Sequence, residues 1–278
     1  MFSAKSKTII VSVLLTALAA CGNGDREEAA ALLDESRTEI TNHNYQKALE
    51  LLDTINSRYR EQTEIRREGL TVRAQAMEGI AMDSISAGDQ ALAEATIRVQ
   101  SLENDFKHID SNVGLDGYYI PKSATDKVMT STGIQPRVSD DGHFYIVANV
   151  QGRSIGLNAV QFTADGETIQ SAVIAPGRVI DVEGSTIASF TPEDLEGMGS
   201  WLVNHALASK CYLLGTKGKI EIPLSKNLKD QLAACAAYSA ALQAKRLALV
   251  HREKYERMLA AARDQLANLQ QTPQNDEK

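Results

Sequence analysis

Apolar residues recur every three or four positions along residues 29–110, which is the spacing of one buried face of an α-helix. The stretch contains no proline, and its pattern breaks near residues 42–44 and 87–89. We therefore predict two helical hairpins over residues 29–110, with a turn at each break. The apolar stripes are formed by Ala29, Leu32, Leu33, Ile40, Ala48, Leu49, Leu52, Ile55, Ile65, Val72, Ala76, Ile80, Met82, Leu92, Ala95, Ile97 and Leu102.

Residues 111–224 have a different pattern, in which β-branched and aromatic residues alternate with polar ones between glycine-containing turns. This alternation predicts a sheet of about five to seven strands. Thr191, followed by Pro192 and two acidic residues, is typical of a helix start, so we expect one helix from there to about residue 208. The predicted strands are Tyr118–Ile120, His143–Val150, Ile155–Thr163, Thr168–Ile174, Arg178–Val182, Cys211–Leu214 and Lys219–Leu224.

Residues 225–270 contain neither proline nor glycine and are rich in alanine, leucine, lysine, arginine and glutamine. This composition predicts one long helix, which would extend over roughly 65 Å. A helix of this length needs a second packing surface, and we expect it to pack on the N-terminal helices. Its apolar seams are Leu228, Leu232, Cys235 and Leu242, then Tyr255, Leu259, Ala262, Leu266 and Leu269. The polar residues 271–278 are expected to be disordered.

These patterns together predict an α+β protein. The N-terminal helical hairpins and the long C-terminal helix would form a helical stalk. A central, mainly antiparallel β domain at residues 111–224 would carry one helix.

The charge of the chain bears on its partners. Lys and Arg number 29 against 36 Asp and Glu, which gives a formal net charge of -7. A chain this acidic has no general electrostatic attraction for the phosphate backbone of nucleic acid. We therefore expect no nucleic acid among its partners.

The amino terminus has the features of an export signal. Lys5 and Lys7 precede an apolar run at residues 8–17, which is shorter than the roughly 20 residues needed to cross a bilayer. Small residues follow the run directly, which favours cleavage over permanent anchoring. The alternative is a buried N-terminal helix. We predict a signal peptide at residues 1–20.

The end of this segment, Leu18-Ala19-Ala20-Cys21, resembles the lipobox of bacterial lipoproteins. The resemblance implies that the chain is cut before Cys21, which then carries the acyl chains that attach the protein to the membrane. Gly22 and Asn23 follow instead of aspartate, which implies the outer membrane and leaves its face open. Residues 21–28 would be an acylated tether, similar to that of some Bacteroidetes surface lipoproteins. The acids of this segment could equally be favourable charges at a helix N-terminus.

The segment 44–52 resembles the turn and second helix of a tetratricopeptide-type hairpin. The two breaks lie 45 residues apart, where that repeat has about 34, so two hairpins rather than a strict array are expected. Tetratricopeptide-like hairpins imply a groove for a partner, with Tyr45, Leu49 and Leu52 as the candidate partner-binding residues. The alternative is that these helices serve only as the packing surface of the stalk.

No catalytic or metal-binding motif is evident in the sequence. The five histidines lack the spacing that would place two of them on one helix face, so we expect no metal site. Residues 215–219 lack the order of a phosphate loop and are better explained as a surface turn. We expect no cofactor and no enzymatic activity.

Aromatic residues of the β domain leave a second class of ligand open. Tyr118, Tyr119, Phe144, Tyr145 and Phe162 could offer stacking platforms for a glycan if several were exposed on one face.

Cys211 and Cys235 could form a disulfide in an exported protein or remain buried thiols, and the sequence favours neither.

The whole layout resembles that of uncharacterised Bacteroidetes-type outer-membrane lipoproteins, a family that brings no activity to carry over. We therefore expect a membrane-anchored, non-enzymatic envelope lipoprotein that acts as a scaffold or adaptor for protein partners. The alternative is a glycan or cell-wall binding module in the β domain. An envelope hydrolase is the third hypothesis.

Overall fold

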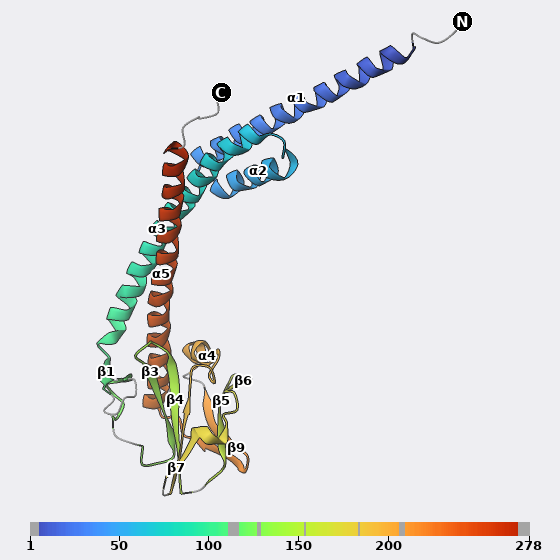
Figure 1. The fold of residues 1–278 in the computed structure, drawn as a ribbon. Coiled ribbons are helices and arrows are strands. Elements are labelled where there is room, and N and C mark those ends of the chain that lie inside the picture. The colour runs from blue at the N-terminus through green and yellow to red at the C-terminus, as the bar shows by residue number, and fades with distance from the viewer. Residues whose placement is uncertain are drawn as a thin grey trace. The chain divides into compact units, whose positions relative to one another are not determined.

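The computed structural model describes residues 6–110, 117–126, 129–152, 154–182, 184–205 and 209–271, with side chains from residue 24 onward. The chain forms two compact units. The first, called the helical unit, comprises residues 1–89 and 250–278, and the second, called the β unit, comprises residues 90–249. The expected fold class is confirmed, because N-terminal helices, antiparallel sheets and a long C-terminal helix are all present (Figure 1).

Three N-terminal helices contribute to the helical unit: α1 (Ser6–Thr41), α2 (Tyr45–Arg58) and the first part of α3 (Thr63–Glu103). Helix α2 folds back against α1 after a short turn (Figure 1). Helix α1 includes residues 21–28, the range of the predicted tether, and the glycines there do not interrupt it. The core between the three helices consists of Ala29, Leu33, Leu52, Ile55, Ile65 and Val72.

The predicted second turn at residues 87–89 is wrong, because α3 continues through it to Glu103. Gly88 is buried, and a Cβ atom placed on it would meet His251 at 3.5 Å and Arg252 at 3.8 Å. The glycine therefore marks a close approach of another helix and does not end α3. The first turn, at residues 42–44, is present as predicted.

The helix that approaches Gly88 is α5 (Lys226–Gln271), whose last 22 residues, 250–271, belong to the helical unit. Its ion pairs connect it to α3: Arg252 Nε lies 3.2 Å from Asp89, and Arg263 Nε donates a hydrogen bond of 2.8 Å to Glu78. The predicted seam from Tyr255 to Leu269 is confirmed by burial, because Ala262 is buried and the other four positions are half-buried, whereas most residues between them are exposed.

The β unit contains two antiparallel sheets. The larger has the order β1-β2-β3-β4-β8-β7 and the smaller has the order β10-β9-β5-β6. The larger sheet comprises β1 (Phe106–Ile109), β2 (Tyr118–Pro121), β3 (Gly133–Ser139), β4 (Phe144–Gln151), β8 (Ser185–Phe190) and β7 (Val179–Val182). The smaller comprises β10 (Gly218–Ile222), β9 (Lys210–Gly215), β5 (Leu157–Ala164) and β6 (Glu167–Gln170).

Three of these strands were not predicted from the sequence. Strand β1 begins at Phe106, inside the range assigned to helical hairpins, and only four residues long it offers little alternation to detect. Strand β3 contains Pro136, a residue that argues against a strand with neighbours on both sides. Strand β8 is rich in small and polar residues and carries Ile187 and Phe190 as its only large apolar residues.

One core joins the two sheets to the helices of the β unit. Phe162, Ile146, Leu213 and Phe190 are fully buried between the sheets. The first part of α5 completes this core with Leu232, Cys235 and Tyr238, and the Tyr238 ring stacks on Phe106 at 4.4 Å. The predicted first seam of α5 is thus confirmed, since Leu232 and Cys235 are buried and Leu228 and Leu242 pack against the core.

Helix α4 (Met198–His205) begins later than expected. Residues 192–197 form consecutive turns, and Gly197 has a φ of +75°, which interrupts the helix that Thr191 was predicted to start. Asp194 nevertheless accepts hydrogen bonds from the Thr191 backbone N–H at 2.8 Å and from both Nη atoms of Arg178 at 2.8 and 2.6 Å. These bonds, above all those from Arg178, hold the pKa of Asp194 below its ordinary value.

Cys211 and Cys235 are both buried free thiols, so the structure has no disulfide between them. Burial raises the pKa of each thiol far above its usual range. Both cysteines therefore act as small apolar core residues.

Candidate functional site

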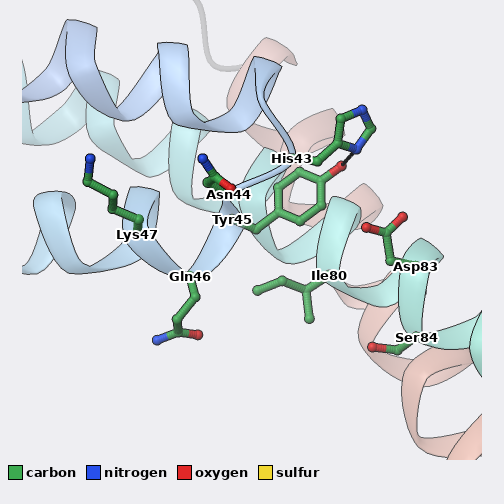
Figure 2. Close-up of a pocket in the computed structure, with 8 residues that line it drawn as sticks. All are labelled: His43, Asn44, Tyr45, Gln46, Lys47, Ile80, Asp83 and Ser84. Atoms are coloured by element: carbon green, nitrogen blue, oxygen red, sulfur yellow. Dashed lines mark hydrogen bonds between the residues drawn. The ribbon is translucent and has the colours of Figure 1, made fainter.

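A pocket of the helical unit lies at the turn between α1 and α2. It encloses about 690 Å³ and is open to solvent on one side. Figure 2 shows the Tyr45 ring between the start of α2 and α3, with Ile80 and Asp83 on α3 beside it. The lining residues are His43, Asn44, Tyr45, Gln46, Lys47, Ile80, Asp83 and Ser84.

The turn that builds one wall is a helix C-terminal motif with an unusual residue. The Asn44 backbone N–H donates to the Glu39 carbonyl at 2.8 Å, and the His43 N–H donates to the Ile40 carbonyl at 3.0 Å. These two bonds define a Schellman motif, in which one residue must be left-handed. His43 occupies that position with a φ of +61°, where glycine is the usual residue.

His43 and Gly79 together fix the position of the Tyr45 ring. The Tyr45 hydroxyl and the Nδ1 atom of His43 share a hydrogen bond of 2.7 Å, and the two rings meet edge to face at 5.6 Å. A Cβ atom at Gly79 would lie 2.3 Å from two atoms of the Tyr45 ring, so the ring can occupy this place only because position 79 is glycine. The pocket wall is therefore preformed by its neighbours.

The cation nearest the start of α2 is already neutralised. Lys47 Nζ donates to Glu39 at 2.5 Å and lies 3.4 Å from Glu35. Asn44 donates a second hydrogen bond of 2.7 Å to the Glu39 carboxylate. The bonds from Lys47 and Asn44 lower the pKa of Glu39 and keep it ionised at neutral pH.

Asp83 has no such partner. It is exposed at the far wall of the pocket, and no ion pair or hydrogen bond to its side chain occurs within the parts of the chain that the structure describes. Ile80 lies half-buried one turn before it. The pocket thus offers a partner an apolar surface, made of Tyr45 and Ile80, beside a free carboxylate.

A second hollow of about 480 Å³ lies on the other side of Tyr45. It is lined by residues of α1, α2 and α3, among them Met82, which is 51% exposed. Tyr45 lines both hollows, so its ring forms a ridge between them.

Three residues were predicted from the sequence to bind a partner, and they differ from one another in exposure. Tyr45 lines both hollows, Leu49 is half-buried against the core, and Leu52 is 2% exposed in that core. His43 and Asp83 were not predicted as site residues, because the sequence indicates the turn at residues 42–44 but neither the left-handed backbone of His43 nor the place of Asp83 across the pocket. Cys21, the predicted lipidation residue, lies within the backbone of α1, but its side chain is outside those described.

The β unit brings two small groups of titratable residues together. His108 lies between Asp140 at 2.7 Å and Asp110 at 3.0 Å, and the hydrogen bond to Asp140 raises its pKa. In the turn between β3 and β4, Asp141 contacts both Ser139 and His143. Asp141 stands between the hydroxyl and the imidazole, so this is not the order of a hydrolytic triad, in which the histidine contacts the serine.

The five aromatic residues proposed as a glycan platform differ in exposure, and two of them, Tyr118 and Tyr145, are half-buried beside Arg137. Phe144 and Phe162 are 7% and 0% exposed and belong to the core. The guanidinium carbon of Arg137 lies 4.0 Å from the centre of the Tyr118 ring, and the Tyr119 ring packs edge to face against the Tyr238 ring. Phe144 and Phe162 are therefore unavailable for glycan stacking, and Tyr118 and Tyr145 are the part of the predicted platform that remains accessible.

Within the described part of the chain, no cluster of His, Cys, Asp or Glu has the geometry of a metal site. No described helix is long and apolar enough to span a membrane.

Comparison with models of known protein families, with curated proteins and with solved structures found no match to this chain.

Proposed function

We propose that this chain is a lipid-anchored, non-enzymatic protein of the bacterial outer membrane, whose helical unit binds a protein partner. The lipid would be attached to Cys21, after cleavage of residues 1–20. The protein would then act as an adaptor that holds its partner at the membrane. No cofactor takes part in this function.

The observation that carries the binding proposal is the pocket at Tyr45. Three features that the fold alone does not require are combined there: a left-handed histidine, a glycine that accommodates an aromatic ring, and a carboxylate without a partner among the described residues. Strained residues concentrate at functional sites, and exposed aromatic residues are frequent in interface hot spots.

The chemistry of the pocket defines the segment that would fit it. Tyr45 and Ile80 favour an apolar side chain, and Asp83 favours a cation within about 4 Å. Lys47 does not compete for an anion, because Glu35 and Glu39 already hold it. We infer a partner segment that presents one apolar and one basic side chain at helical spacing.

The anchor can be tested independently of the pocket. Cells expressing the protein would be labelled with a palmitate analogue and then separated into soluble and membrane fractions. We expect label in the wild-type protein and its recovery with outer membranes. The Cys21→Ala variant should carry no label, and labelling of that variant would contradict the lipidation proposal.

The pocket can be tested by photo-crosslinking in intact cells. A photoreactive amino acid at Gln46 faces the pocket, and one at Glu50, a turn later on α2 and exposed outside it, serves as the matched control. We expect one discrete adduct from position 46, none from position 50, and loss of the adduct in the Tyr45→Ala background. Equal adducts from both positions would contradict binding at the pocket.

A further inference from the structure

The β unit contains a second feature that the proposed function does not use: a cleft beside the free edge of the larger sheet. Strand β7 ends that sheet, and within the described residues it pairs only with β8. Next to it lies a cleft of about 460 Å³. The cleft is lined by Ser154, Gly156, Leu157, Asn158, Val173, Ile174, Pro176, Val179, Asp181, Thr186, Thr216 and Lys217.

Side chains of β7 alternate between the cleft and the opposite face of the sheet. Val179 and Asp181 line the cleft, and Asp181 accepts a hydrogen bond of 2.6 Å from its cross-strand neighbour Thr186. Ile180 and Val182 therefore point to the other face, where they are 63% and 53% exposed. Both faces of this short edge strand thus present apolar surface.

Backbone hydrogen bonds fix one wall of the cleft, where residues 216–217 contact residues 155–156. Lys217 N–H donates to the Ile155 carbonyl at 2.9 Å, and Thr216 N–H donates to the Gly156 carbonyl at 3.1 Å. A Cβ atom at Gly215 would lie 2.3 Å from the Ile155 carbonyl oxygen, so this close approach requires glycine. These contacts fix the wall of the cleft formed by residues 154–157 and 216–217.

The charges at the cleft differ in their availability. Asp181 is engaged by Thr186, whereas Lys217 makes no ion pair within the described residues. The Lys217 ammonium group therefore favours an acidic group on whatever occupies the cleft.

We propose that the free edge of β7 and the adjoining cleft bind an extended segment of a protein partner by strand addition. Only an extended chain can pair with a strand edge while its alternate side chains contact both faces of the sheet. Side chains on one face would enter the cleft, with an acidic residue near Lys217, and those on the other would cover Ile180 and Val182. This site does not depend on the proposed role of the helical unit.

The test is a binding titration of full-length protein in detergent micelles with a fluorescent peptide of about eight residues. The peptide consists of valine and threonine with one central glutamate. One control peptide has lysine in place of glutamate, and another has two central prolines, which cannot pair as a strand. We expect the glutamate peptide to bind, the lysine peptide to bind at least tenfold more weakly, and the proline peptide not to bind.

Substitutions at exposed positions test the site without removing core residues that the fold requires. Ile180→Lys should weaken binding of the glutamate peptide at least tenfold, whereas Val203→Lys, at a 49% exposed valine of α4, should leave it unchanged. Lys217→Glu should reverse the preference between the glutamate and lysine peptides. Unaltered melting temperatures would show that each variant is folded.

Two results would overturn the proposal. One is a titration in which the three peptides bind equally or none binds. The other is sedimentation equilibrium showing a dimer that Ile180→Lys dissociates, because the edge of β7 would then pair with a second copy of this chain.

Discussion

The helical unit and the β unit use their cores differently. In the β unit, two sheets and part of α5 enclose one continuous core in which several aromatic rings are fully buried. In the helical unit, a small aliphatic core holds three helices, and the Tyr45 ring beside the α1–α2 turn remains partly exposed and lines two hollows. A well-filled core confers stability, whereas a ring held at the surface by its neighbours remains available for contact, which is the basis of the proposed partner site at Tyr45.

The largest expected effect tests the core of the β unit. Replacing Phe162 by alanine removes a ring with no exposed surface and leaves a cavity between the sheets. We expect the free energy of unfolding to fall by about 3–5 kcal/mol, measured by urea denaturation with Trp201 fluorescence as the signal. Val173→Ala, at a position 66% exposed, should change it by less than about 0.5 kcal/mol. Similar losses in both variants would show that Phe162 is not a core residue.

A smaller loss is expected in the helical unit when Gly79 becomes alanine. The new methyl group would lie 2.3 Å from the Tyr45 ring and would displace it. Alanine favours helix by about 1 kcal/mol over glycine, yet we expect a net loss of about 1–2 kcal/mol, followed by circular dichroism during urea denaturation. Gly24→Ala on α1 has no atom within 4 Å and should be stabilising. Equal stabilisation of both variants would mean that Tyr45 does not pack on Gly79.

Acid stability tests the buried carboxylate of the β unit. Because Arg178 lowers the pKa of Asp194 in the folded state, this pair stabilises the protein above the ordinary aspartate pKa of about 4. The stabilisation is lost as the pH falls through the lowered pKa. Melting temperatures measured from pH 6 to pH 2 should therefore fall less steeply for Arg178→Ala than for wild type.

The matched control for this titration is the exposed pair of Lys226 and Asp230. Lys226→Ala should leave the pH dependence of the melting temperature as it is in wild type. A profile for Arg178→Ala that coincides with wild type would contradict the role assigned to the Asp194 contact.

The smallest expected effect compares the left-handed residues of the two units. His43→Gly, made in a Tyr45→Ala background where the His43 side chain no longer has its contacts with that ring, should raise the free energy of unfolding by up to about 1 kcal/mol, because glycine adopts this conformation without strain. Asp165→Gly, in the turn between β5 and β6, should gain less, since aspartate tolerates the left-handed region better. Chemical denaturation of both variants measures the difference, and a larger gain at Asp165 would argue against strain at His43.

Much of the fold could be predicted because its signals are local. The long α5, with its two seams, and strands such as β4 and β5 follow from apolar spacing and from the absence or presence of turn residues. The turn at residues 87–89 was predicted wrongly because a glycine that ends a helix and one that admits a neighbouring helix are identical in sequence. Pro136 concealed β3 because proline is expected only where a strand lacks a partner on one side. Strand β2 pairs with β3 only at Val138 and Ser139, so Pro136 lies at such a place.

The candidate site was predictable only at Tyr45. The turn pattern around residues 44–52 led to it, because that pattern places an aromatic residue at the start of α2. His43 and Asp83 gain their significance from the left-handed backbone and from the position of α3 across the pocket. The turn that contains His43 was predicted, but its left-handed backbone and its bond to Tyr45 were not, and the place of Asp83 across the pocket is a tertiary feature.

The central claim is that the pocket at Tyr45 binds a protein partner through its apolar ring and the Asp83 carboxylate. Its most direct test measures the yield of the position 46 photo-crosslink in Asp83→Lys, with Glu50→Lys as the matched charge reversal outside the pocket. We predict that Asp83→Lys lowers the yield at least tenfold, that Glu50→Lys leaves it unchanged, and that reversing the charge of the crosslinked basic residue on the partner restores it. An equal yield in the two variants would contradict the claim.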